Sequence, residues 1–147
     1  MPHRNFSSES EIHRIGLGLI DLSLPKTEWT HAAHFAAALW LLRYRPEWDA
    51  SRRMPDFIRA YNEATGVANT ATSGYHETIT LASLGAAAAH AEANPRAAVH
   101  ELANMLLAGP CGEKDWLLEY WSRGMLFSPL ARARWVDPDV AILPFSV

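Results

Sequence analysis

The sequence predicts an all-α protein, a bundle of five or six helices that forms a single domain over residues 1–147. Apolar residues recur three and four positions apart in several long stretches, as on the buried face of a helix. The alternation typical of strands never persists beyond four residues. Proline and glycine separate the helical stretches, and the chain is long enough to bury a core without disulfides or metal.

The first two helices are predicted over residues 9–21 and 27–44. Ser8 and Glu11 have the spacing of a capping box at the start of the first helix. Thr27 is expected to cap the second helix, whose many alanines would let a neighbouring helix approach closely. Prolines end both helices, at Pro25 and Pro46.

Further helices are predicted over residues 55–62, 75–92, 95–107 and 114–123, and one or two helical turns over residues 129–134. Ser73 or Gly74 is expected to cap the helix over residues 75–92, and Pro95 suits the first position of the next one. Residues 1–8 are expected to be flexible. Residues 136–147 are expected to form an extended tail that packs on the body of the domain.

Composition and charge exclude several classes of function. The net charge of −3 and the scattered arginines argue against a nucleic-acid partner. The longest apolar stretch, residues 32–42, is shorter than the ~20 residues that a membrane span needs. A single cysteine, Cys111, fits a reducing compartment, so we predict a cytoplasmic protein. The expected partner is a small-molecule ligand, and a homodimer is left open.

Two compact clusters of ionisable side chains open two of the predicted helices. The first spans residues 28–34 and contains His31 and His34, which are three positions apart and therefore share one helix face. The second spans residues 74–78 and contains His76 next to Glu77. Imidazole and carboxylate are the ligands that zinc, iron and manganese accept from proteins, and they are also the usual general acids and bases.

The clusters predict a mononuclear site for a divalent metal ion, zinc, iron or manganese, with His31, His34 and His76 as ligands. Glu77 would be the base or a fourth ligand. It lies about 100° around the helix from His76, so both could bind one ion only with the relaxed geometry of a first turn. Tyr75 is a second catalytic candidate. The alternative is a purely structural role, in which the histidines cap helices or form hydrogen bonds within the bundle and Glu77 is a favourable charge at a helix N-terminus.

Two familiar metal motifs are absent. The histidines of the first cluster are not four apart, as in a His-x-x-x-His zinc motif. Glu28 and His31 match the Glu-x-x-His motif of di-iron bundles, but such a centre needs two copies and the chain has one.

Four residues are candidates for substrate binding, namely Glu28, Thr80, Arg123 and Arg132. The two arginines belong to a segment, with Arg134, that could bind a carboxylate or phosphate. We favour the other interpretation, in which they pair with Asp137 and Asp139 and so fix the tail.

The clusters, together with a third motif, resemble a family of short bacterial proteins of uncharacterised function. The resemblance covers roughly residues 20–143 and rests on three motifs, WTHxxH, GYHETIT and YxSR…LFSPxAR, at residues 29–34, 74–80 and 120–132. It implies that His31, His34, His76 and Glu77 belong together. It brings no established activity.

The resulting hypothesis is a metal-dependent enzyme that acts on a small polar molecule. It requires the N-terminal halves of the helices over residues 27–44 and 75–92 to lie close together. The alternative is a non-catalytic module that binds a small molecule or a protein. An interaction module would show an exposed apolar patch near Trp116, Trp121 and Trp135.

Overall fold

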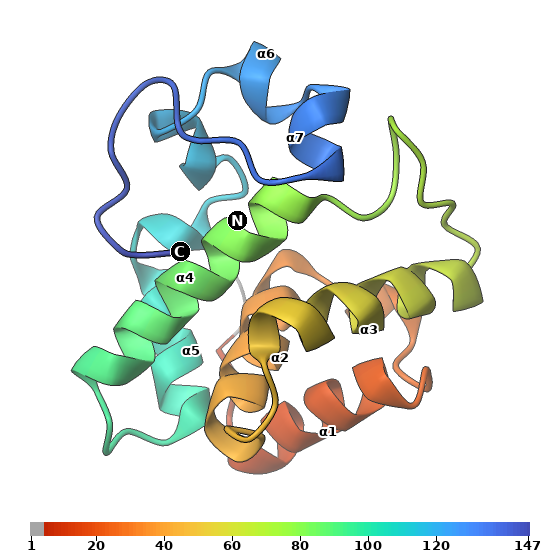
Figure 1. Ribbon diagram of the computed structural model, residues 1–147. Helices are drawn as coiled ribbons and strands as arrows, with labels where there is room; N and C mark the ends of the chain where they lie inside the picture. The colour runs from red at the N-terminus through yellow and green to blue at the C-terminus, as the bar shows by residue number, and fades with distance from the viewer. Residues whose placement is uncertain (1–4) are drawn as a thin grey trace.

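The computed structural model describes residues 5–147, and within that range the regular structure is entirely helical (Figure 1). The all-α prediction is confirmed. The α-helices are α1 (Glu9–Ile20), α2 (His31–Tyr44), α3 (Ala50–Ala64), α4 (Glu77–Ala93), α5 (Val99–Ala108), α6 (Arg123–Leu126) and α7 (Pro129–Ala133). Three 3-10 helices join them, η1 (Lys26–Glu28), η2 (Pro110–Gly112) and η3 (Trp116–Glu119).

Helix α2 is the centre of the core and packs against α1, α3, α4 and α5. Most of its residues are buried, and its apolar surface runs all the way round, as expected for a helix surrounded by others. Gly16 of α1 makes room for the buried Trp40 of α2, since a Cβ at Gly16 would lie 2.3 Å from the indole. Small residues therefore allow the close packing that the alanine content predicted.

Helix α2 begins later than predicted. Thr30, not Thr27, is the N-cap, and its hydroxyl accepts a hydrogen bond from the Ala33 amide at 3.2 Å. The preceding residues form the separate 3-10 turn η1. Glu28 therefore lies outside the helix, although the sequence predicted it in the first turn.

Helix α4 also has a different cap from the predicted Ser73 or Gly74. His76 is the N-cap, and its Nδ1 accepts a hydrogen bond from the Ile79 amide at 3.2 Å. Histidine is not among the residues usually preferred at this position, so the sequence did not indicate it.

Two other predicted helices change their bounds. Helix α3 begins at Ala50 instead of residue 55, because the Asp49 side chain caps it and accepts a hydrogen bond from the Ser51 amide. Helix α5 begins at Val99 instead of residue 95. Its own N-cap residue is an alanine, and Glu9 of α1 supplies the missing acceptor, 2.6 Å from the His100 amide.

The prediction of one helix over residues 114–123 is wrong. The chain forms only the 3-10 turn η3 there and then starts α6, with Ser122 as its N-cap. Asp139 accepts hydrogen bonds from the amide and hydroxyl of Ser122, at 2.7 and 2.6 Å. These contacts with the C-terminal segment hold Ser122 in the extended conformation that begins a new helix.

Both ends of the described chain are held by contacts. The segment 1–8 was predicted to be flexible; residues 1–4 lie outside the described residues, whereas Phe6 exchanges two backbone hydrogen bonds with the side chain of Asn104, each 2.9 Å long. Residues 135–147 contain no helix or strand. Figure 1 shows the C-terminus against α4, where a Cβ at Gly85 would lie 2.8 Å from the Ser146 carbonyl oxygen.

None of the helices within residues 5–147 is both long enough and apolar enough to cross a membrane.

Candidate functional site: a cavity between two helix starts

Helices α2 and α4 pack against each other, and residues from their N-terminal halves line one cavity of about 350 Å³. This confirms the predicted proximity of the two helices. Other walls come from α3, the region around η3, and α6. The apolar part of the lining consists of Phe35, Ala38, Met54, Ile58, Ile79, Leu84, Trp116, Leu117, Leu118, Leu126 and Phe127.

His31 is the first residue of α2 and lines this cavity. Its Nε2 lies 2.7 Å from the backbone carbonyl oxygen of Cys111. A carbonyl can only accept, so the proton is on Nε2 and, in the neutral ring, Nδ1 carries a lone pair. The ring packs edge-on against Phe35, with 5.4 Å between centroids. Nδ1 has no hydrogen-bond partner among the described residues.

His34 lines the same cavity one turn further on. Its Nδ1 donates to the Thr30 carbonyl at 2.7 Å, and its ring stacks on Trp29 at 3.8 Å between centroids. Burial, with a smaller effect of the nearby His31, lowers the pKa of His34 from 6.5 to about 4, although the hydrogen bond to Thr30 acts in the opposite direction. The ring is therefore neutral at pH 7, with a bare lone pair on Nε2. That nitrogen is unpaired within residues 5–147.

Both ring nitrogens of His76 form hydrogen bonds within the fold. Nε2 donates to the Leu126 carbonyl at 2.7 Å, while Nδ1 accepts the Ile79 amide as the cap of α4. The side chain is 7% exposed, and burial lowers its pKa. Both ring nitrogens are thus in use, which leaves no lone pair for a metal ion.

Tyr75 and Glu77, the predicted catalytic pair, bind each other. The Tyr75 hydroxyl donates to Glu77 Oε1 at 2.5 Å, and the Arg59 guanidinium lies 4.2 Å above the Tyr75 ring. Burial and the bond to Glu77 raise the pKa of Tyr75. Neither residue lines the cavity. The pair joins the loop before α4 to its first turn.

These contacts bear on the metal site predicted from the sequence. Among the described residues, no group of three or more His, Cys, Asp or Glu side chains is arranged to hold a metal ion. His31 and His34 each keep one open nitrogen, but His76 keeps none and Glu77 is bound to Tyr75. The structure therefore brings together two of the three predicted histidine ligands.

Two side chains of α4 that carry hydroxyls line the cavity, Thr80 and Ser83. The Thr80 hydroxyl also forms a hydrogen bond with the Tyr75 side chain. Thr80 was among the predicted substrate-binding residues. Ser83 was missed, although it lies three positions further along the same helix and therefore on the same face. No hydrogen bond joins either hydroxyl to His34 in the described part of the chain.

The other predicted substrate-binding residues lie elsewhere. Glu28 forms a bidentate ion pair with Arg14 on the surface, with 2.7 Å between Nη2 and Oε2. Arg132 Nη1 donates to the Gly74 carbonyl at 2.8 Å. Arg123 is exposed, with its guanidinium 5.6 Å from the Phe127 ring. None of the three charged residues lines the cavity.

The expected pairing of these arginines with Asp137 and Asp139 is wrong. Asp137 accepts a hydrogen bond from Trp135 Nε1 at 3.0 Å, and Asp139 accepts from Ser122. The tail is thus attached through neutral donors. A further buried contact links Val136 to Thr78, whose hydroxyl accepts from the Val136 amide at 3.2 Å.

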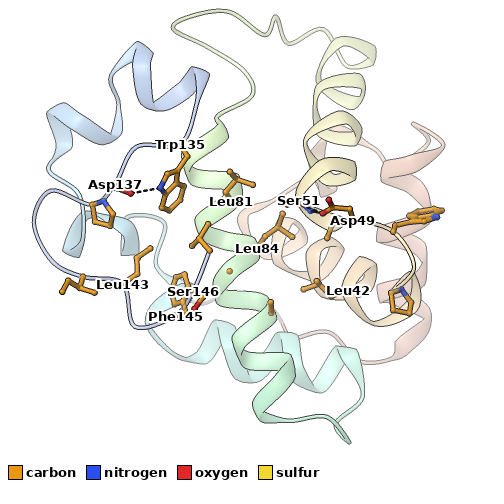
Figure 2. Close-up of a pocket in the computed structure, with 18 residues that line it drawn as sticks. Leu42, Asp49, Ser51, Leu81, Leu84, Trp135, Asp137, Leu143, Phe145 and Ser146 are labelled. Carbon is orange, nitrogen blue, oxygen red and sulfur yellow. Dashed lines mark hydrogen bonds between the residues drawn. The ribbon is translucent and has the colours of Figure 1, made fainter.

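Figure 2 shows a second, more open hollow of about 1070 Å³ between α4, the start of α3 and the C-terminal segment. Leu81 and Leu84 of α4 and Trp135 of the C-terminal segment are among the residues that line it. Its carboxylates already accept hydrogen bonds, Asp49 from the Ser51 hydroxyl and Asp137 from Trp135 Nε1. The hollow therefore offers mainly apolar surface, and both of its aspartates already accept hydrogen bonds from neighbouring side chains.

Two of the three tryptophans near which an interaction module would show an exposed apolar patch are themselves buried. Trp116 is 7% exposed and Trp121 is fully buried. Trp121 instead donates from Nε1 to the Val136 carbonyl at 3.1 Å and packs edge-on against Trp135. These indoles hold the C-terminal segment to the body.

Comparisons of the chain with models of protein families, with curated proteins and with solved structures gave no match. The resemblance to the bacterial family therefore stays a prediction from the sequence motifs, and the case for function rests on the geometry of the cavity.

Proposed function

We propose that this protein is a non-catalytic binding protein that holds a small, mostly apolar molecule in the cavity between α2 and α4. The observation that supports this best is the cavity itself, about 350 Å³ in volume and walled mainly by aliphatic and aromatic side chains. Small-molecule sites typically have about 300–1,000 Å³ and combine an apolar lining with a few polar groups. The unpaired nitrogens of His31 and His34 and the hydroxyls of Thr80 and Ser83 are those groups here.

Catalysis is the weaker proposal for the same cavity. A general base works best with a pKa near the operating pH, and the pKa of His34, about 4, makes its ring a poor proton acceptor at pH 7. No hydrogen bond prepares Thr80 or Ser83 as a nucleophile by joining it to His34. A neutral imidazole with a low pKa is better suited to accept a hydrogen bond from a ligand and keep it.

A neutral fluorescent probe tests the proposal. N-Phenyl-1-naphthylamine, which brightens in apolar surroundings, should bind the full-length protein saturably with a stoichiometry of one. Ser83→Leu places a branched side chain in the cavity and should weaken binding at least tenfold. Ser146→Leu, which alters the open hollow of Figure 2 instead, is the matched control and should leave affinity unchanged.

Two outcomes would overturn this proposal. Absence of saturable binding in the wild-type protein would mean that the cavity does not take up apolar molecules. Weakening by Ser146→Leu but not by Ser83→Leu would place the binding site in the open hollow. Circular dichroism melts of both variants establish that each is folded.

The cytoplasm remains the proposed compartment, because the chain has a single cysteine, Cys111, and so no intramolecular disulfide. This thiol is buried, and burial raises its pKa to about 11, so it stays protonated and poorly reactive. A buried lone thiol on a turn that also binds His31 suits a protein kept under reducing conditions.

A further inference from the structure

The apolar walls of the cavity are rich in flat rings. Phe35 and Trp116 lie with their centroids 6.2 Å apart, and Phe127 also faces the cavity. Met54, whose polarisable sulfur favours contact with aromatic rings, lines the wall formed by α3. Aromatic side chains prefer offset or edge-to-face contacts with other rings, and such contacts add stability beyond the area they bury. This lining favours a planar aromatic ligand over a flexible aliphatic one.

The polar groups of the cavity are divided between its two helices. On α2, His34 presents Nε2 as an acceptor, because Nδ1 is fixed as the donor to Thr30. On α4, the hydroxyl of Ser83 can donate as well as accept, whereas that of Thr80 already has the Tyr75 side chain as a partner. A ligand hydroxyl both donates one hydrogen bond and accepts others, so it can satisfy both walls.

The charged residues of the lining are at its edge. Lys114 and Asp115 are exposed and also line a neighbouring polar hollow of about 1060 Å³. Apart from these two and His31, the lining carries no formal charge at pH 7, since the ring of His34 is neutral there. A buried charge without a partner is costly, so the part of the ligand inside the cavity is uncharged.

We propose that the ligand is a neutral hydroxylated aromatic compound of the phenol class, with its hydroxyl group donating to His34 Nε2 and its ring lying among Phe35, Trp116 and Phe127. This inference rests on the proposed function, because it names the ligand class of the same cavity. It makes His34 the residue that determines specificity for the hydroxyl group, with Ser83 as the donor on the opposite wall.

Isothermal titration calorimetry with three matched probes tests the inference at pH 7. The probes are 2-naphthol, 2-methoxynaphthalene, which lacks the donor, and 2-methylnaphthalene, which lacks both donor and acceptor. The full-length protein should bind 2-naphthol about tenfold or more tightly than either of the others, as expected for one buried hydrogen bond. His34→Phe keeps a ring that can stack on Trp29 but removes the acceptor, so it should abolish the preference.

His90→Phe is the matched control, because His90 lies on α4 outside the cavity lining and its Nε2 has no partner among the described residues. It should preserve the preference for 2-naphthol. His34→Gln provides a second test that keeps a hydrogen-bond acceptor, and it should retain part of the preference. Thermal melts confirm folding of each variant.

The possible failures are distinguishable. Equal affinity for all three probes would overturn the phenol inference and leave the proposed binding function standing. A preference for 2-naphthol that survives in His34→Phe would overturn the role of His34. Tighter binding of 1-octanol than of 2-naphthol would overturn the aromatic class. Failure of every probe, 1-octanol included, would overturn the binding function as well.

Discussion

The starts of α2 and α4 carry the same kinds of side chain but use them in opposite ways. At α2, His31 and His34 each donate one hydrogen bond to a backbone carbonyl and keep the second nitrogen free at a cavity. At α4, His76 uses both nitrogens, and the neighbouring tyrosine and glutamate bind each other. One start is therefore available to a ligand, whereas the other is part of the framework.

This contrast shows that the type of residue does not determine its role at a helix start. A histidine can cap a helix when Nδ1 accepts an amide, and it then becomes structural if a carbonyl also meets Nε2. It stays functional when its second nitrogen faces a cavity. The following predictions would break or sharpen the distinction between the two starts.

The largest effect on the free energy of unfolding is expected from replacing His76. His76→Ala removes the cap of α4 and leaves the Leu126 carbonyl without its donor, so we expect a loss of roughly 2–4 kcal/mol in the free energy of unfolding. Urea denaturation followed by circular dichroism measures it. His34→Ala is the comparison and should cost at most about 1.5 kcal/mol, since it removes one ring stack and one hydrogen bond. Equal losses in the two variants would contradict the contrast.

Two threonines of α4 provide a finer test of the same contrast. The Thr78 hydroxyl is fully buried within 2.7 Å of the Ala131 carbonyl oxygen, so Thr78→Val should lower the free energy of unfolding by roughly 1–3 kcal/mol. Thr80→Val changes a side chain that lines the cavity and removes only its contact with the Tyr75 hydroxyl, so it should cost at most about 1 kcal/mol. Urea denaturation measures both changes. A larger loss for Thr80→Val would make the cavity wall part of the framework.

Acid should affect the available histidine in a defined pH window. The pKa of His34 is lowered from 6.5 to about 4 in the folded protein. Between these values the unfolded chain binds the additional proton, so this contribution to stability is present at pH 7 and is lost as the pH falls from about 6.5 towards 4. The Cε1 proton of His34 should show no NMR titration above about pH 5.5. A midpoint near 6.5 would mean that the ring is exposed to water.

The melting temperature of His34→Gln should accordingly depend less on pH between 4 and 6.5 than that of the wild-type protein. Glutamine has no titrating group in this range, so any pH dependence that remains belongs to other residues. An unchanged dependence would show that His34 contributes nothing to acid stability.

No effect is expected from metal removal. With both nitrogens of His76 engaged, a metal ion has at most two open imidazoles at the start of α2, so a chelator should leave the melting temperature of untagged protein unchanged. Elemental analysis provides the second measurement. Stoichiometric zinc, iron or manganese whose removal lowers the melting temperature would support the metal-dependent enzyme predicted from the sequence.

The sequence alone determined the helical architecture and the neighbourhood of the site. Helical spacing of apolar residues predicted the long helices, and the many alanines of α2 predicted close packing, because both depend on residues near one another in the chain. The WTHxxH and GYHETIT segments predicted two polar helix starts, and both histidines of the first segment do line a cavity. Local patterns therefore located the residues of interest.

Only the tertiary structure decided which of those residues are free. The acceptor for His31 is the carbonyl of Cys111, eighty positions away, and the acceptor for His76 is the carbonyl of Leu126, fifty positions away. Backbone carbonyls are common to every residue, so no side-chain pattern shows which one will meet an imidazole. The physical reason is that a histidine has two ring nitrogens, and packing between distant segments determines whether the second is bound or open.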